Sequence, residues 1–138
     1  MSPQLPNTEF QAQLISAARA ACGRAYSPYS RFCVGAAVLA ADHRVFAGCN
    51  VENASYGLAI CAERVAVFHA VASGIKSIKA LAVYTPTPTP TAPCGACRQV
   101  LREFASDMDV VCVCDGPGQI CSKLSDLLPQ AFGPENLA

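Results

Sequence analysis

Hydrophobic residues recur at the spacing of an α-helix in three stretches of the chain. Residues 61–74 have apolar residues along their whole length, contain no proline and end at Gly74, which predicts a largely buried helix. Residues 94–106 are apolar on one face only, which predicts a helix at the surface of a core. Residues 8–22 form the third helix, with these apolar positions on one side: Phe10, Leu14, Ile15, Ala18 and Cys22.

Runs of valine, alanine and other small apolar residues between these helices predict strands. Residues 31–40 and 45–50 flank a polar turn and predict a β-hairpin. Residues 79–85 and 110–114 predict two more strands, and residues 124–128 a short helix. Because strands alternate with helices, the pattern favours a mixed sheet covered on both faces, a three-layer α/β/α sandwich.

Residues 85–93, with the sequence TPTPTPTAP, are the only low-complexity segment. Its four prolines exclude both a helix and a central strand, because proline lacks an amide donor and fixes its own φ angle. We interpret the segment as a stiff connector. The alternative is a recognition segment for a proline-binding partner.

Composition narrows the class of protein. A length of 138 residues is typical of one domain, so we expect residues 1–138 to form a single one. Ten basic and ten acidic residues give a net charge of zero, so no positive field attracts a polyanion and we expect no nucleic-acid partner. The apolar runs are too short to cross a bilayer, and residues 1–10 lack the regions of a secretion signal. We expect no membrane partner and a cytoplasmic protein.

Three of the nine cysteines stand where helices are predicted to start. Cys61 begins one helix, and Cys94 and Cys97, three residues apart, begin another. Cysteines with that spacing face the same side of a helix, so three thiolates are able to converge on one ion. Zinc prefers sulfur, and three protein ligands leave a fourth position for water, as catalytic sites require. We expect one Zn²⁺ per chain and interpret the other six cysteines as core thiols.

Two motifs, Cys61-Ala62-Glu63 and residues 93–97 (Pro-Cys-Gly-Ala-Cys), together resemble the cytidine deaminase family of zinc enzymes. Either motif alone is a weak signal, but the two in this order are specific. The likeness spans almost the whole chain, through residues 30–32, 48–56, 61–66, 93–101 and 128–132. It implies a cytidine deaminase-like catalytic domain with a five-stranded sheet, and deamination of cytidine and 2′-deoxycytidine in pyrimidine salvage.

The chemistry agrees with this resemblance. Zinc lowers the pKa of bound water, so hydroxide is available at neutral pH to attack C4 of a cytosine ring. Glu63 lies two residues from a ligand and is the expected catalytic proton carrier, to N3 and then to the departing amine. Three thiolates leave a negative charge on the metal centre, and we expect Arg64 and Arg98 to compensate it by hydrogen bonding to sulfur.

The resemblance also implies the substrate-binding residues. Asn50 and Glu52 are expected on the ribose hydroxyls, and Phe32 against the nucleoside. A carboxylate at the 3′-hydroxyl repels a continuing phosphate backbone, which favours a free nucleoside. The family implies a homotetramer with shared active sites, in which Ala54, Tyr56 and Phe132 reach the site of a neighbouring subunit.

Three other functions fit parts of the pattern. One is the same chemistry on another aminopyrimidine nucleoside, such as a modified cytidine or an antibiotic of the blasticidin S type. The second is a non-catalytic zinc or redox-thiol module. The third is a polynucleotide-editing deaminase, which the zero net charge and the lack of a basic tail disfavour.

Overall fold

The computed structural model describes residues 8–138. Residues 1–10 were predicted to lack a secretion signal, and the first seven of them lie outside the described part of the chain. Five strands form one mixed sheet in the order β2-β1-β3-β4-β5, which confirms the predicted fold class. β3 and β4 pair in parallel, and the other neighbours are antiparallel. The strands are β1 Gly35–Ala40, β2 Val45–Cys49, β3 Ile78–Tyr84, β4 Asp109–Val113 and β5 Ile120–Lys123.

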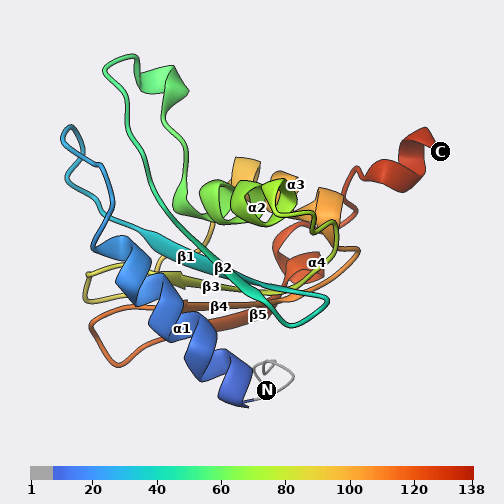
Figure 1. The fold of residues 1–138 in the computed structure, drawn as a ribbon, viewed down its shortest axis with the longest axis horizontal. Coiled ribbons are helices and arrows are strands. Elements are labelled where there is room, and N and C mark those ends of the chain that lie inside the picture. Colours follow the sequence, from blue (N-terminus) through green and yellow to red (C-terminus); the bar gives the residue numbers. More distant parts are fainter. Residues whose placement is uncertain (1–7) are drawn as a thin grey trace.

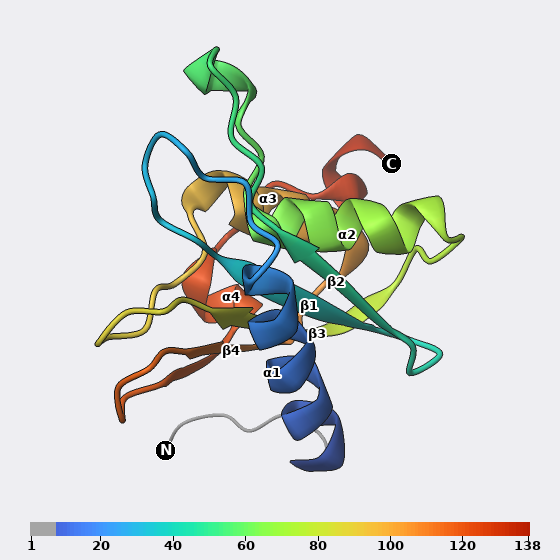
Figure 2. The ribbon, with the colours of Figure 1, turned by 60° about the vertical axis from the view of Figure 1, so that its left-hand side comes forward.

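Helices cover both faces of the sheet, as Figures 1 and 2 show. α1 lies on one face, and α2 and α3 lie side by side on the other. Among residues 8–138, no helix combines the length and apolar character that a bilayer crossing demands. The helices are α1 Thr8–Cys22, α2 Ala62–Ala72, α3 Gly95–Phe104 and α4 Leu124–Leu127, with 3-10 turns η1 Tyr56–Leu58 and η2 Pro134–Leu137.

Strand β1, in the interior of the sheet, contributes to two hydrophobic cores. All of its residues are buried, and successive side chains point to opposite faces of the sheet. Ala36 and Val38 pack toward α2 and α3, whereas Ala37 and Leu39 pack toward α1. Burial on both faces explains why this strand is apolar throughout rather than alternating.

The topology gathers three loops at one edge of the sheet. β1 is antiparallel to both β2 and β3, and β3 is parallel to β4, so β2, β3 and β4 all end at the same edge. The segment before α2, the Thr-Pro loop (residues 85–93) and the turn at residues 114–118 follow these strand ends. Ligands in open α/β sheets bind at such an edge.

Three local predictions differ from the structure. Residues 31–34 are not part of β1, because the Asn50 side chain bonds their backbone. α2 is not largely buried: Phe68 is 48% exposed, and Val71 is exposed too. The local pattern also missed β5, a partly buried edge strand of four residues whose burial does not alternate.

Candidate metal centre and active site

Two helix starts place the sulfurs of the candidate metal centre. Cys61 and Cys94 are the extended N-cap residues of α2 and α3. The partial positive charge of a helix N-terminus stabilises a thiolate there. α2 approaches β2 closely at Gly48, where a Cβ would lie 2.4 Å from the backbone nitrogen of Ala66. The site is therefore tied directly to the sheet.

The three predicted ligands converge. Cys61 Sγ lies 3.9 Å from Cys94 Sγ, and Cys94 Sγ lies 3.4 Å from Cys97 Sγ. All three sulfurs lie within 4.8 Å of one another, although Cys61 is 33 residues away from Cys94 along the chain. Tetrahedral zinc with bonds of about 2.3 Å separates its sulfurs by about 3.8 Å. The donor set and its spacing therefore fit zinc.

Arg64 lies beside these sulfurs. Its Nη2 donates a hydrogen bond to Cys61 Sγ at 3.2 Å. Hydrogen bonding from the Cys97 thiol and from Arg64 lowers the pKa of Cys61 to about 5. The pKa of Cys97 is raised, because its thiol donates to Cys61 and is buried. The hydrogen bonds from Cys97 and Arg64, with the positive charge of Arg64, thus favour a thiolate at Cys61.

Arg98 has partners other than the predicted thiolate. Its Nε donates to the carbonyl oxygen of Pro93 at 2.7 Å, and its Nη1 to that of Leu127 at 2.8 Å. The expected hydrogen bond to sulfur is therefore wrong for Arg98. This arginine instead ties the residue before Cys94 to the end of α4.

Glu63 lies beside the sulfurs in the first turn of α2, with only 5% of its surface exposed. Burial, and then the negative charge of Cys61, raise the pKa of this carboxyl, whereas its own backbone amide and Arg64 oppose the rise. Apart from that amide, no residue among 8–138 hydrogen-bonds the carboxylate side chain. Glu63 is therefore available to a bound molecule.

A pocket of about 290 Å³ opens over Glu63 and the two N-cap cysteines. Of the residues expected to bind substrate, it is lined by Phe32, Asn50 and Glu52. The rest of its wall was not predicted as substrate-binding: Ser30, Val34, Ala59, Ile60, Ala62, Val83, Thr91 and Ala92.

Asn50 holds the strand-like segment that carries Phe32. Its Oδ1 accepts a hydrogen bond from the backbone nitrogen of Val34 at 2.9 Å. Its Nδ2 donates to the carbonyl oxygen of Phe32 at 2.7 Å. The amide thus replaces the strand pairing that residues 31–34 lack, and it positions Phe32 over the pocket.

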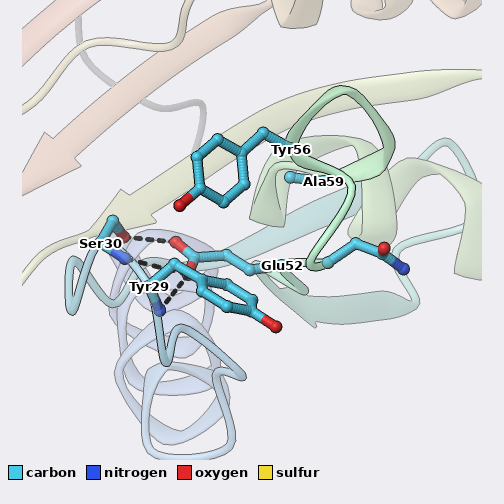
Figure 3. Close-up of a pocket in the computed structure, with 6 residues that line it drawn as sticks. Tyr29, Ser30, Glu52, Tyr56 and Ala59 are labelled. Carbon is cyan, nitrogen blue, oxygen red and sulfur yellow. Dashed lines mark hydrogen bonds between the residues drawn. The ribbon is translucent and has the colours of Figure 1, made fainter.

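Glu52 similarly holds the preceding turn, as Figure 3 shows. Its Oε1 accepts hydrogen bonds from the backbone nitrogens of Tyr29 at 2.9 Å and Ser30 at 3.1 Å, and Ser30 Oγ donates to Oε2. The Ser30 hydroxyl, followed by the two amides, lowers the pKa of this carboxyl. The bond from Ser30 was not predicted, because its partner Glu52 lies 22 residues further along the chain.

Ala54, Tyr56 and Phe132 are not among the residues that line the pocket over the metal centre. Ala54 and Tyr56 belong to a segment that extends from the body of the protein in Figures 1 and 2. Tyr56 is 76% exposed and lines a second pocket of about 330 Å³ together with Tyr29 and Glu52. Phe132 is 58% exposed. The prediction that these three residues reach a neighbouring subunit stays a prediction.

Comparison with known proteins agrees with this geometry. Residues 8–114 match the family model described as the cytidine and deoxycytidylate deaminase zinc-binding region. The chain is 46% identical over 127 residues to a cytidine deaminase of Sporosarcina psychrophila, covering 91% of this chain and 93% of that protein. It is 44% identical over 133 residues to a cytidine deaminase of Mycobacterium tuberculosis, covering 96% of each.

Solved structures are similar too. The crystal structure of cytidine deaminase from Burkholderia pseudomallei superimposes with a TM-score of 0.83 at 50% identity, over 88% of this chain and 98% of that one. The cytidine deaminase from Mycobacterium tuberculosis gives a TM-score of 0.77 at 45% identity, over 89% of this chain and 97% of that one. This chain therefore belongs to the cytidine and deoxycytidylate deaminase family, with the zinc-binding region that defines it.

Proposed function

We propose that this chain hydrolyses cytidine and 2′-deoxycytidine to uridine and 2′-deoxyuridine, adding water and releasing ammonia. Residues 1–138 act as one catalytic domain in this proposal. The observation that carries it is the convergence of three sulfurs beside one buried carboxyl, Glu63, where Cys61, Cys94 and Glu63 line one pocket. The family and the relatives named above support the same reaction.

Cys61, Cys94 and Cys97 would hold one Zn²⁺ per chain. Zinc bound there lowers the pKa of coordinated water and so makes hydroxide available at neutral pH. Glu63 accepts one proton from the attacking water and delivers it to N3 of the ring. It then carries the second proton, from the new C4 hydroxyl, to the amine, so that ammonia leaves as the C4 carbonyl forms. Arg64, which donates to Cys61, offsets the negative charge of the thiolates.

Substrate recognition follows from the pocket wall. Phe32 lies against the nucleoside, and Asn50 and Glu52 bind the ribose hydroxyls at the rim. Both side chains already hold the backbone of residues 29–34, so in this proposal they position that segment and contact the sugar at once. The Glu52 carboxylate repels a phosphate, which favours a nucleoside over a nucleotide or a polynucleotide.

We also propose a homotetramer with shared active sites. Apolar and aromatic side chains are exposed on the extended segment, on α2 and near the C-terminus, which is typical of an interface. Ala54, Tyr56 and Phe132 complete a neighbouring pocket in this assembly. Light scattering on the purified chain tests the subunit count, and a monomer with full activity would refute the sharing of sites.

A cytoplasmic role in pyrimidine salvage completes the proposal. All nine cysteines are free thiols, a state that reducing compartments maintain. Fractionation of cells that produce the chain tests its compartment. Growth on cytidine as the pyrimidine source, with and without its gene, tests the salvage role.

A substrate panel tests the reaction. The purified protein is assayed by ultraviolet absorbance with cytidine, 2′-deoxycytidine, cytosine and cytidine monophosphate, and its zinc content is measured in parallel. We expect turnover of the two nucleosides and a large loss with the others, because a pocket that hydrogen-bonds particular groups rejects analogues without them.

Each rival function has its own outcome. If the protein is inactive on both nucleosides but turns over a modified cytidine or an aminopyrimidine antibiotic, that compound is its substrate. One zinc per chain with no ammonia released from any substrate indicates a non-catalytic zinc or redox-thiol module. Deamination of a single-stranded oligonucleotide indicates a polynucleotide-editing enzyme.

A further inference from the structure

The Thr-Pro loop (residues 85–93) forms part of the active-site wall. Its last residues before Pro93, Thr91 and Ala92, line the pocket over Glu63. Within the loop, the Oγ1 atoms of Thr85 and Thr87 lie 2.7 Å apart, and Thr87 Oγ1 donates to the carbonyl oxygen of Thr89 at 2.7 Å. With four prolines fixing φ as well, the loop has few free torsions. A displacement at its middle is therefore transmitted to its end.

The loop rests on the turn at residues 114–118, which follows the neighbouring strand β4. The buried Cys114 Sγ lies 3.6 Å from the carbonyl oxygen of Pro88. It lies 3.6 Å and 3.4 Å from the carbonyl oxygens of Gly116 and Gly118 as well. The backbone nitrogen of Asp115 donates to the carbonyl oxygen of Thr87 at 2.9 Å. The Cys114 thiol thus lies among carbonyls of both segments.

Gly116 makes the closest approach between the two segments. A Cβ at this position would lie 2.0 Å from the carbonyl oxygen of Pro88, so any side chain displaces the loop. The φ of Gly116 is outside the left-handed region, so the requirement for glycine is purely steric. At Gly118, in the same turn, a Cβ would meet only Pro90 Cδ, at an ordinary 3.6 Å.

The turn itself is anchored to the rest of the fold. Arg19 of α1 donates from Nη2 to the carbonyl oxygen of Cys114 at 3.4 Å. Tyr84, at the end of β3, donates from its hydroxyl to Asp115 Oδ1 at 2.5 Å, and Arg19 lies over the Tyr84 ring. A steric clash between the turn and the loop is therefore expected to move the loop rather than the turn.

The metal ligands lie beyond the reach of such a movement. Pro93 is held by Arg98, and Cys94 is fixed as the N-cap of α3. Thr91 and Ala92 come before this anchor along the chain. A displaced loop therefore reshapes the pocket wall and leaves Cys94 and Glu63 in place.

We propose that Cys114 and Gly116 are positioning residues for substrate binding, which act by docking the Thr-Pro loop and thereby placing Thr91 and Ala92 in the pocket wall. This assignment rests on the proposed deamination and names a determinant of its substrate affinity. The connector predicted from the sequence is, in this proposal, a wall of the site. It acts on KM rather than on the chemical step.

The test compares Gly116→Ala with the matched control Gly118→Ala. We expect Gly116→Ala to raise KM for cytidine about tenfold, because a displaced pocket wall loses contacts that bind the ground state and the transition state alike. We expect kcat to change less than about threefold, which is the signature of lost uniform binding. Zinc content is expected to stay at the wild-type level. We expect Gly118→Ala to match the wild-type protein in all three quantities.

Cys114 supplies a second pair of variants. We expect Cys114→Ala, which removes the donor, to raise KM about threefold to tenfold, and Cys114→Ser, which restores a hydroxyl donor, to recover part of that loss. Amide hydrogen exchange at Thr87, Thr89 and Thr91 is expected to speed up in Gly116→Ala and Cys114→Ala but not in Gly118→Ala.

Three outcomes overturn the assignment. The first is a folded Gly116→Ala protein with wild-type KM, and the second is a Cys114→Ala protein with wild-type KM. The third is a parallel fall of kcat and zinc content, which would place the loop in support of the metal centre. If the wild-type chain and Gly118→Ala both fail to deaminate cytidine, the proposed function is refuted, and this role in binding falls with it.

Discussion

The two sides of the pocket are built in different ways. At its base, Cys61 and Cys94 are N-caps of helices packed on the sheet, and Glu63 is almost fully buried. At its rim, Phe32 is exposed on a segment without regular structure, held by the side chains of Asn50 and Glu52.

This difference separates the reaction from the recognition of substrate. The base is positioned by backbone elements and a hydrophobic core, so small perturbations leave it in place. The rim is positioned by a few hydrogen bonds in contact with solvent. Substitutions at the base are therefore expected to act on zinc and kcat, and those at the rim on KM.

The largest effect is expected when a sulfur at the base is removed. Cys94→Ser should lower zinc content well below one per chain and reduce kcat by more than about 10⁴-fold, because it removes the metal along with acid–base catalysis. Metal analysis and the cytidine assay measure both. The control Cys121→Ser, away from the three clustered sulfurs, keeps zinc and activity. Full activity without zinc in Cys94→Ser would refute the metal site.

Loss of the carboxyl at the base should separate catalysis from metal binding. Glu63→Gln is expected to lower kcat by about 10²–10⁴-fold, because the amide cannot carry the proton. Zinc is expected to remain bound. Glu103→Gln, on the exposed side of α3, is the control and should be fully active. A Glu63→Gln protein with wild-type kcat contradicts the role of Glu63.

A smaller effect is expected at Arg64. Arg64→Gln removes the donor to Cys61 Sγ and should weaken zinc affinity about 10- to 100-fold, as measured by competition with a chelator. Arg44→Gln is the control, since Arg44 pairs with Asp42 in an exposed turn. Unchanged zinc affinity and turnover in Arg64→Gln would exclude Arg64 from charge compensation.

The smallest effect is expected at the rim. Glu52→Ala removes the acceptor for the backbone amides of Tyr29 and Ser30 and should raise KM about tenfold. Its kcat and zinc content are expected to stay at the wild-type level. The KM of Glu52→Gln is expected to lie between those of the wild-type protein and Glu52→Ala. A loss of zinc in either variant would contradict the separation of base and rim.

The pH dependence of the rim follows from the same carboxyl. Hydrogen bonds from Ser30 and Tyr29 lower the pKa of Glu52 from its usual value of 4.5. Because the folded pKa is the lower one, the stabilisation is complete above pH 4.5 and is lost only as the pH falls through the lowered pKa. Hydrogen exchange at Tyr29 and Ser30, followed down this range, is expected to rise in the wild-type protein but to be already fast in Glu52→Ala.

The base of the site was predictable because its signal is local. Cys94 and Cys97 share one helix turn, and Glu63 lies two residues from Cys61, so spacing alone places these groups. Arg64 was predictable for the same reason. Arg98 was not: its neighbours suggested a thiolate, whereas its observed partner Leu127 lies 29 residues away.

Apart from β5, the sequence alone determined the types of the main helices and strands, the three-layer arrangement and the four groups at the base, because hydrophobic periodicity and helix starts are properties of neighbouring residues. Only the tertiary structure decided that Ser30 meets Glu52, that residues 31–34 leave the strand, and that the Thr-Pro loop rests on the turn after β4. Those contacts depend on which strand ends meet at one edge of the sheet, and no local pattern encodes that meeting.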